Sequence, residues 1–145
     1  MIYNFYDFRS KKNENLVKKL IKSFERIFPY WAKDISCIQR PSDGNAIATV
    51  CLEPEYRRIV INIMPEFFLH DKEECSDFLL HEVCHAINGT YATWVKYTVL
   101  EFIKDKYPDA YEILDTEHTN KFESITEELK YTMKGLLNDQ GSVCN

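Results

Sequence analysis

The chain has 145 residues, of which 45% are hydrophobic and 28% are charged, so the composition predicts a globular protein with a real core and excludes a disordered one. A net charge of −5 at pH 7 argues against a nucleic-acid backbone as the partner, and no run of about 18 apolar residues predicts a membrane span. Five cysteines without a CxxC pair, and a start without a leader-like segment, predict a cytoplasmic protein with free thiols. We expect one domain over residues 1–138 and a mobile tail over 139–145.

The first predicted element is an amphipathic helix. Apolar residues recur at helical spacing between Leu16 and Phe28, lysines occupy the opposite side, and Pro29 ends the run. We interpret the lysines as a solvated face.

Three short strands are predicted next, over residues 35–39, 46–52 and 57–64, because β-branched runs alternate there with turn residues. Ile59, Ile61 and Ile63 fall on one face of the last strand, so helices should cover that face. These patterns predict an α+β fold with an N-terminal helix, a small three-stranded and mainly antiparallel sheet arranged as a meander, and helices after it.

The segment His81-Glu82-Val83-Cys84-His85 carries the chemistry of the chain. On a helix its two histidines lie one turn apart on the same side, so both rings can bind one zinc ion. A water molecule activated by zinc could then lose its proton to Glu82, which would pass it to a leaving amine. Cys84 is predicted to face the core and not the metal.

The surroundings of this motif predict the helix that it requires, over residues 71–88. Asp71 and Glu74 have the spacing of a capping box, and Asn88-Gly89 is typical of a helix stop. An apolar stripe on the other side of the helix would be buried, and it comprises Leu79, Val83, Ala86 and Ile87, widened by Leu80 and Cys84.

Helices are also predicted for the rest of the chain. One covers residues 93–106 and stops where Tyr107 precedes Pro108, and a short helical piece follows over residues 109–115. A polar cluster with capping residues at 116–120 separates it from a last helix over residues 121–137. The buried stripe of that helix is predicted to be Phe122, Ile125, Leu129, Met133 and Leu136.

Two histidines do not complete a catalytic zinc site, which usually has three protein ligands and an open position. With its HExxH motif the chain resembles a minimal gluzincin-type metallopeptidase domain, similar to small zincin-like proteins of phage and mobile elements. The segment HEVCHAI also resembles the motif helix of SprT-like proteases. The resemblance covers the strands, the motif helix and the last helix, and only HExxH is specific to it.

This resemblance implies a zincin-like fold and one zinc ion per chain. It implies Glu123 as the third ligand and Glu127 as a residue that orients one of the histidines without binding the metal. The reverse assignment, with Glu127 as the ligand, stays open. An SprT-like site would instead take His118. The metzincin pattern is excluded, because it needs glycine and histidine where this chain has Asn88 and Tyr91.

Three residues are candidates for stabilising the oxyanion that forms when water attacks a carbonyl: His118, Tyr91 and Tyr131. His70 is interpreted as a surface loop residue. No feature of the sequence predicts an oligomeric state.

The function expected from these features is zinc-dependent hydrolysis of peptide bonds, with Glu82 as general base and a peptide or protein as substrate. Zincins commonly bind an extended peptide along an edge strand, which here would be one of the strands between Ala46 and Met64. Two alternatives stay open: a zincin-fold binding or adaptor protein of a mobile element that cleaves nothing, and a zinc hydrolase of a non-peptide amide.

Overall fold

The structure is a computed structural model that describes residues 1–42, 44 and 46–139. The chain divides into two compact units, residues 1–87 and 88–145. Helix α2 (Lys72–Trp94) runs across this boundary and so contributes to both units. Of the tail predicted over 139–145, Asp139 is the last residue of a helix, and residues 140–145 lie outside the described part.

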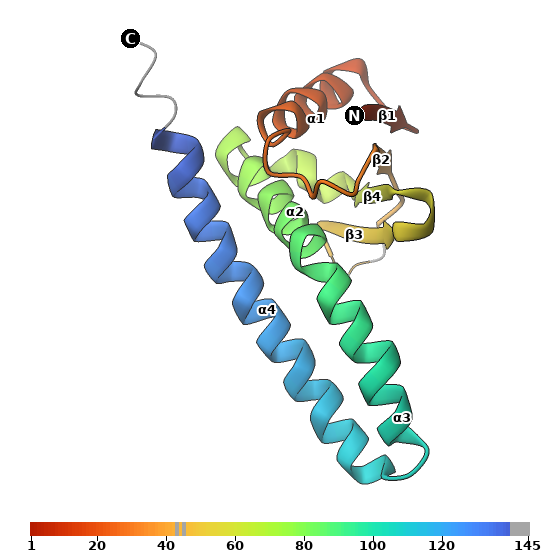
Figure 1. Cartoon of the computed structure of the whole chain (residues 1–145). Coiled ribbons are helices and arrows are strands. Elements are labelled where there is room, and N and C mark those ends of the chain that lie inside the picture. The colour runs from red at the N-terminus through yellow and green to blue at the C-terminus, as the bar shows by residue number, and fades with distance from the viewer. Residues whose placement is uncertain (43, 45, 140–145) are drawn as a thin grey trace. The chain divides into compact units, whose positions relative to one another are not determined.

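The first unit is built on a four-stranded sheet (Figure 1). Its elements in chain order are β1 (Ile2–Tyr6), α1 (Lys11–Ser23), β2 (Asp34–Gln39), β3 (Ala48–Glu53), η1 (Pro54–Tyr56), β4 (Arg58–Ile63), η2 (Pro65–Leu69) and the first part of α2.

The strand order is β1-β2-β4-β3, with β1 parallel to β2, β2 parallel to β4, and β3 antiparallel to β4. The α+β class is confirmed, but the predicted three-stranded, mainly antiparallel meander is wrong. Strand β1 was missed, and β4 lies between β2 and β3. A parallel pair needs a crossover connection, and α1 supplies it between β1 and β2.

The two faces of this sheet differ in polarity. In the register of β2 with β4, Ile35 lies opposite Ile59 and Cys37 opposite Ile61, and these four side chains are fully buried. On the other face polar groups pair instead: the Asn4 side chain donates to Asp34 at 3.0 Å. The hydrophobic core of the unit therefore lies on one side of the sheet.

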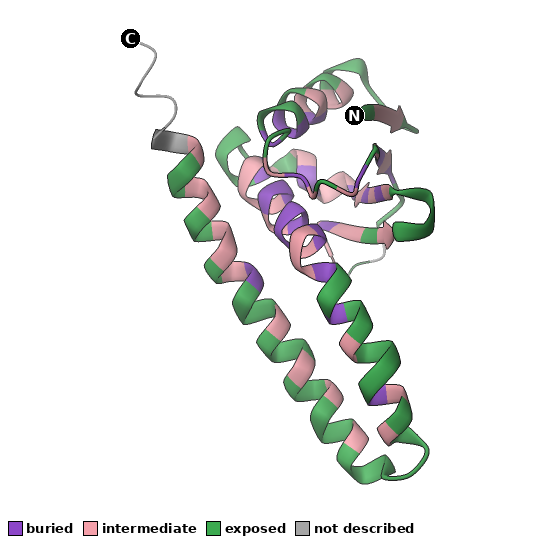
Figure 2. Ribbon diagram, in the orientation of Figure 1, coloured by how far each residue is buried: buried purple, intermediate pink, exposed green. Residues whose placement is uncertain are grey.

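Helices α1 and α2 complete that core, as the buried positions in Figure 2 show. Helix α1 begins earlier than predicted because the Ser10 side chain accepts a hydrogen bond from the Asn13 N–H at 3.1 Å and caps it. It ends at Ser23, and the turn that follows brings Phe24 and Phe28 to buried positions before Pro29.

The start of α2 is confirmed and its predicted end is wrong. Asp71 and Glu74 form the expected reciprocal cap. The helix continues through Asn88-Gly89. A glycine that ends a helix usually adopts a left-handed backbone with positive φ. Gly89 does not adopt it, because Gly44 is the glycine with positive φ within the described part of the chain. A helical glycine costs about 1 kcal/mol relative to alanine, which tertiary contacts can offset.

The second unit consists of helices. After α2 come η3 (Val95–Leu100), which is a π-helix, then α3 (Glu101–Lys104) and α4 (Pro108–Asp139). The predicted stop at Tyr107-Pro108 is confirmed, with Pro108 as the first residue of α4.

Helix α4 is continuous, so the predicted break at residues 116–120 is wrong. The hydroxyl of Thr116 donates to the Glu112 carbonyl at 2.9 Å inside the helix and caps nothing. The pieces expected over residues 109–115 and 121–137 are therefore one helix. No helix in the described ranges combines the length and the apolar character needed to cross a membrane.

Candidate metal centre

His81 and His85 project from one side of α2, as their spacing predicts. The Nε2 atoms of the two rings are 2.9 Å apart, with ring centroids 4.5 Å apart and ring planes inclined by 85°. Both residues are half-buried. The Nε2 atoms of His81 and His85, both on α2, are therefore placed close enough together to bind one ion.

This spacing fits a shared metal ion. With zinc–nitrogen bonds of about 2.0–2.1 Å and tetrahedral angles, two ligand nitrogens lie about 3.3 Å apart. The observed 2.9 Å differs by a few tenths of an ångström, which a small rotation of either ring would supply. The imidazole rings of His81 and His85 thus need no rearrangement of the helix to act as a pair of ligands.

A third residue is a candidate for the same group. His81, His85 and Glu123 could together hold a metal ion. Glu123 lies on α4, in the second unit. These are the residues that the gluzincin resemblance implies as ligands. Imidazole and carboxylate donors together are typical of zinc and of related divalent ions.

Glu82, the candidate general base, is 9% exposed. Carboxylates are seldom buried to this extent unless specific neighbours compensate for the lost hydration. The next two residues of α2, Val83 and Cys84, are fully buried. A carboxylate beside the histidine pair is therefore withdrawn from bulk water.

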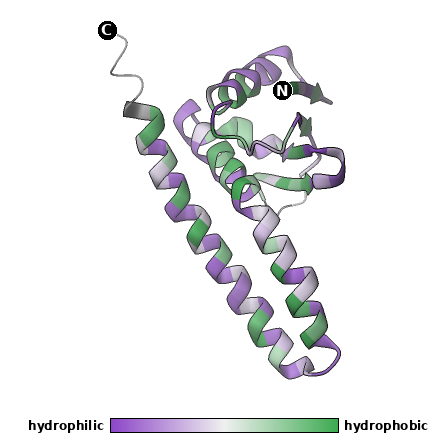
Figure 3. Ribbon diagram, viewed as in Figure 1, coloured by the Kyte–Doolittle hydropathy of each residue, from purple (hydrophilic) through white to green (hydrophobic). Residues whose placement is uncertain are grey.

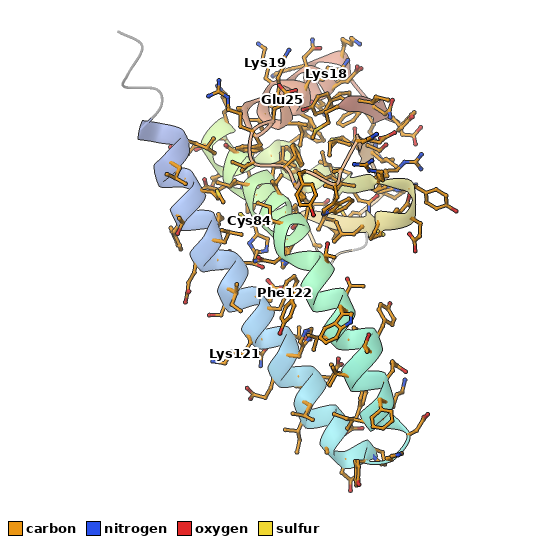
Figure 4. The ribbon with its side chains drawn as sticks, viewed as in Figure 1. Lys18, Lys19, Glu25, Cys84, Lys121 and Phe122 are labelled. Carbon is orange, nitrogen blue, oxygen red and sulfur yellow. The ribbon has the colours of Figure 1, made fainter. Side chains whose placement is uncertain are left out.

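The apolar side of α2 anchors these residues. Leu79, Val83 and Ala86 are fully buried, as the stripe predicts. Cys84, labelled in Figure 4, is also fully buried and forms no disulfide, which agrees with its predicted place in the core. The packing of the apolar face of α2 thus sets the direction in which the opposite face, with His81 and His85, points.

The remaining candidates lie in the second unit. Tyr91 and Tyr131 are 73% and 69% exposed, and Tyr91 stacks on Trp94 with centroids 6.3 Å apart. The ring of His118 lies parallel to that of Phe122 at 6.4 Å. Glu127 pairs with Lys130 at 2.7 Å. The metal-binding group found among the described residues includes none of these side chains.

His70 has a more defined place than the surface loop that was expected. It follows η2, and its Nδ1 atom lies 3.2 Å from Glu74 Oε2. Its ring meets that of Phe78 edge to face with centroids 5.0 Å apart. His70 therefore packs against the first turns of α2 and is not part of the metal-binding group.

Sequence reasoning left open which strand between Ala46 and Met64 lies at an edge of the sheet. In the described part of the chain β1 and β3 are the two edge strands, and β3 pairs with β4 alone. The parallel insertion of β4 produces this arrangement, and no local pattern in the sequence signals it.

Comparisons with known proteins add no assignment: no family model matches this chain, and neither curated proteins nor solved structures give a match. Interpretation of the site therefore depends on its own residues and geometry.

Proposed function

We propose that this protein is a zinc-dependent metallopeptidase. The observation that supports the proposal most strongly is the 2.9 Å approach of the His81 and His85 Nε2 atoms on one helix, with Glu82 between them in the sequence. This combination of two imidazoles and an adjacent carboxylate is what hydrolysis by activated water needs.

In the proposed site His81, His85 and Glu123 hold the metal. A zinc ion bound there would polarise the scissile carbonyl and lower the pKa of water toward neutrality. Glu82 takes a proton from the attacking water at its carboxylate and delivers it to the leaving amine. Its burial supports this role, since a carboxylate withdrawn from bulk water exchanges its proton with the substrate more readily than with solvent.

On the continuous helix α4, Glu123 and His118 face different directions, and Glu123 is the one that belongs to the candidate metal group. At about 100° per residue, five positions place these side chains about 140° apart around a continuous helix. Glu127 lies about 40° from Glu123, so it can support the same site. We therefore propose Glu127 as a residue that orients a ligand, and we give His118 no metal ligand role.

The edge strand supports a peptide as substrate. Among the described strands β3 lies at an edge of the sheet, and an extended peptide can add to such an edge as a further strand. Recognition through main-chain hydrogen bonds accepts many side chains, as a peptidase requires.

Metal analysis of purified protein tests the ligand set. We expect about one zinc per chain in the wild type and a loss of most zinc in His81→Ala, His85→Ala and Glu123→Ala. The matched controls are His70→Ala and Glu128→Ala, which remove a histidine and an α4 glutamate outside the group and should keep the metal. Retention of zinc in Glu123→Ala would move the third ligand elsewhere.

Cleavage of a mixed peptide library, followed by mass spectrometry, tests the reaction. Glu82→Gln should keep zinc and lose cleavage by a factor of at least about 10². The control is Glu73→Gln, which makes the same substitution on the same helix but outside the motif and should keep cleavage. A wild type that binds zinc and cleaves nothing would favour the adaptor alternative, and unchanged turnover in Glu82→Gln would refute the mechanism.

A further inference from the structure

The second unit buries few side chains. Among its residues with described burial, those that are buried are Gly89, Ala92, Leu100 and Thr126. Figure 2 shows that α4 is largely exposed or half-buried along its length, and Figure 3 shows apolar residues recurring along the same helix. An amphipathic helix with its apolar residues in water usually has a partner.

Three of these apolar residues form a straight stripe. Leu114, Ile125 and Leu136 are 42%, 53% and 53% exposed and are spaced 11 residues apart. Eleven residues are almost three full turns, so the three side chains share one side of α4. The stripe is about 33 Å long, at about 1.5 Å per residue.

The stripe is symmetric about its middle. Ile125 has one leucine 11 residues before it and one 11 residues after it. Two copies of α4 placed antiparallel about a two-fold axis at Ile125 would therefore bring Leu114 of each copy opposite Leu136 of the other. A closed dimer has such a self-complementary surface.

The charges beside the stripe fit the same pairing. Lys121 and Glu128 are exposed, lie on one flank of the stripe and form no ion pair within the described part of the chain. In the antiparallel arrangement the same flanks of the two helices meet. Because the axis passes through position 125, Glu128 of the second copy lies opposite residue 122 of the first copy. It is therefore one position along the helix from Lys121 of the first copy. Two such pairs of opposite charge form, one on each side of the axis.

We infer from this that the protein forms an antiparallel homodimer through the stripe Leu114–Ile125–Leu136 of α4. A contact about 33 Å long and about 10 Å wide covers roughly 300 Å², which is less than the roughly 800 Å² per partner of stable complexes. The dimer is therefore weak and depends on concentration. Glu123 lies about 160° around the helix from Ile125, so the dimer contact and the proposed metal ligand occupy opposite sides of α4.

Sedimentation velocity tests the dimer. Between about 2 µM and about 200 µM the mass of the wild type should rise from the 17.2 kDa of one chain toward twice that value. Ile125→Glu, which sets two like charges face to face on the axis, should stay at 17.2 kDa throughout. Asn120→Glu, exposed and about 140° away on the same helix, should behave as the wild type.

A charge exchange tests the orientation without touching the apolar stripe. Lys121→Glu and Glu128→Lys should each weaken association about tenfold, and the double variant should restore it, because only the antiparallel register makes these positions neighbours. Circular dichroism checks that every variant keeps the helical content of the wild type. A wild type that is monomeric at every concentration, a dimeric Ile125→Glu, or a double variant without restoration would each overturn the inference. Zinc removal should leave the mass unchanged, so the dimer and the proposed activity can fail separately.

Discussion

Asp71 and Glu74 cap α2 reciprocally. Asp71 Oδ1 accepts from the Glu74 backbone N–H at 2.9 Å, and Glu74 Oε2 accepts from the Asp71 backbone N–H at 3.2 Å. These bonds occupy backbone donors that the first turn of a helix would otherwise leave without partners. The cap therefore sets where the helix of His81 and His85 begins.

Loss of this cap should lower stability. We expect Asp71→Ala to reduce the free energy of unfolding by about 1 kcal/mol, the usual cost of removing a side-chain acceptor at a helix start. Asp71→Asn keeps an acceptor and should lose clearly less. Urea denaturation followed by circular dichroism measures both, and equal losses in the two variants would contradict the role of the cap.

The thiols should differ sharply in reactivity. Burial raises the pKa of Cys37 to about 12, and it also raises the pKa of Cys75, with Asp71 and Glu74 adding to the effect. Because the thiolate is the reactive form, both should resist alkylation at pH 8, as should buried Cys84, while exposed Cys51 reacts quickly.

Mass spectrometry after brief alkylation measures this difference. Cys144 lies outside the described residues, so the experiment uses a Cys144→Ser background. We expect one fast thiol in the folded protein and four in urea. In the same background, Cys51→Ser should have no fast thiol. Rapid modification of Cys37 without denaturant would show that the β2–β4 core is more open than the structure indicates.

Tyr3 should couple stability to alkaline pH. Burial, and after it the neighbouring Glu25 carboxylate (labelled in Figure 4), raises the pKa of Tyr3 from 10.0 to about 12. Folding therefore favours the neutral phenol. This contribution is fully present below pH 10 and is lost as the pH rises through 12.

Tyr3→Phe removes the titrating group, so its stability should fall less steeply than that of the wild type between pH 10 and pH 12. Tyr6→Phe, a more exposed position on the same strand, controls for the loss of a hydroxyl. Urea denaturation at several pH values measures the slopes. Parallel curves for Tyr3→Phe and the wild type would refute the coupling.

Metal removal should destabilise the folded protein if the proposed site is correct. A ligand present at 100 times its Kd stabilises by about 2.7 kcal/mol, which corresponds to a rise in Tm of roughly 5–10 °C for a chain of this size. Chelation should lower the Tm by this amount, and zinc should restore it while magnesium should not. His81→Ala should show no response to chelation. A chelator effect that persists in His81→Ala would locate the metal elsewhere.

Several parts of this molecule follow from short stretches of sequence. Asp71 and Glu74 predict a helix start because both capping bonds span three residues. His81 and His85 predict a shared ligand direction because four residues make about one helical turn. The burial of Leu79 and Val83 follows from the same periodicity. These features depend on neighbours along the chain, so one sequence is enough to predict them.

Other parts depend on residues that are distant in sequence. The three patterns between residues 35 and 64 predict strands, but β4 pairs with β2 because of contacts across the sheet, and β1 joins them although its own pattern is weak. The continuity of α2 beyond Gly89, and of α4 through residues 116–120, overrides residues that usually end or cap helices. Local preference there amounts to about 1 kcal/mol per residue, which packing of a long helix can exceed. The candidate metal centre divides in the same way. Spacing within α2 brings His81 and His85 together, whereas no local spacing relates them to Glu123 on α4.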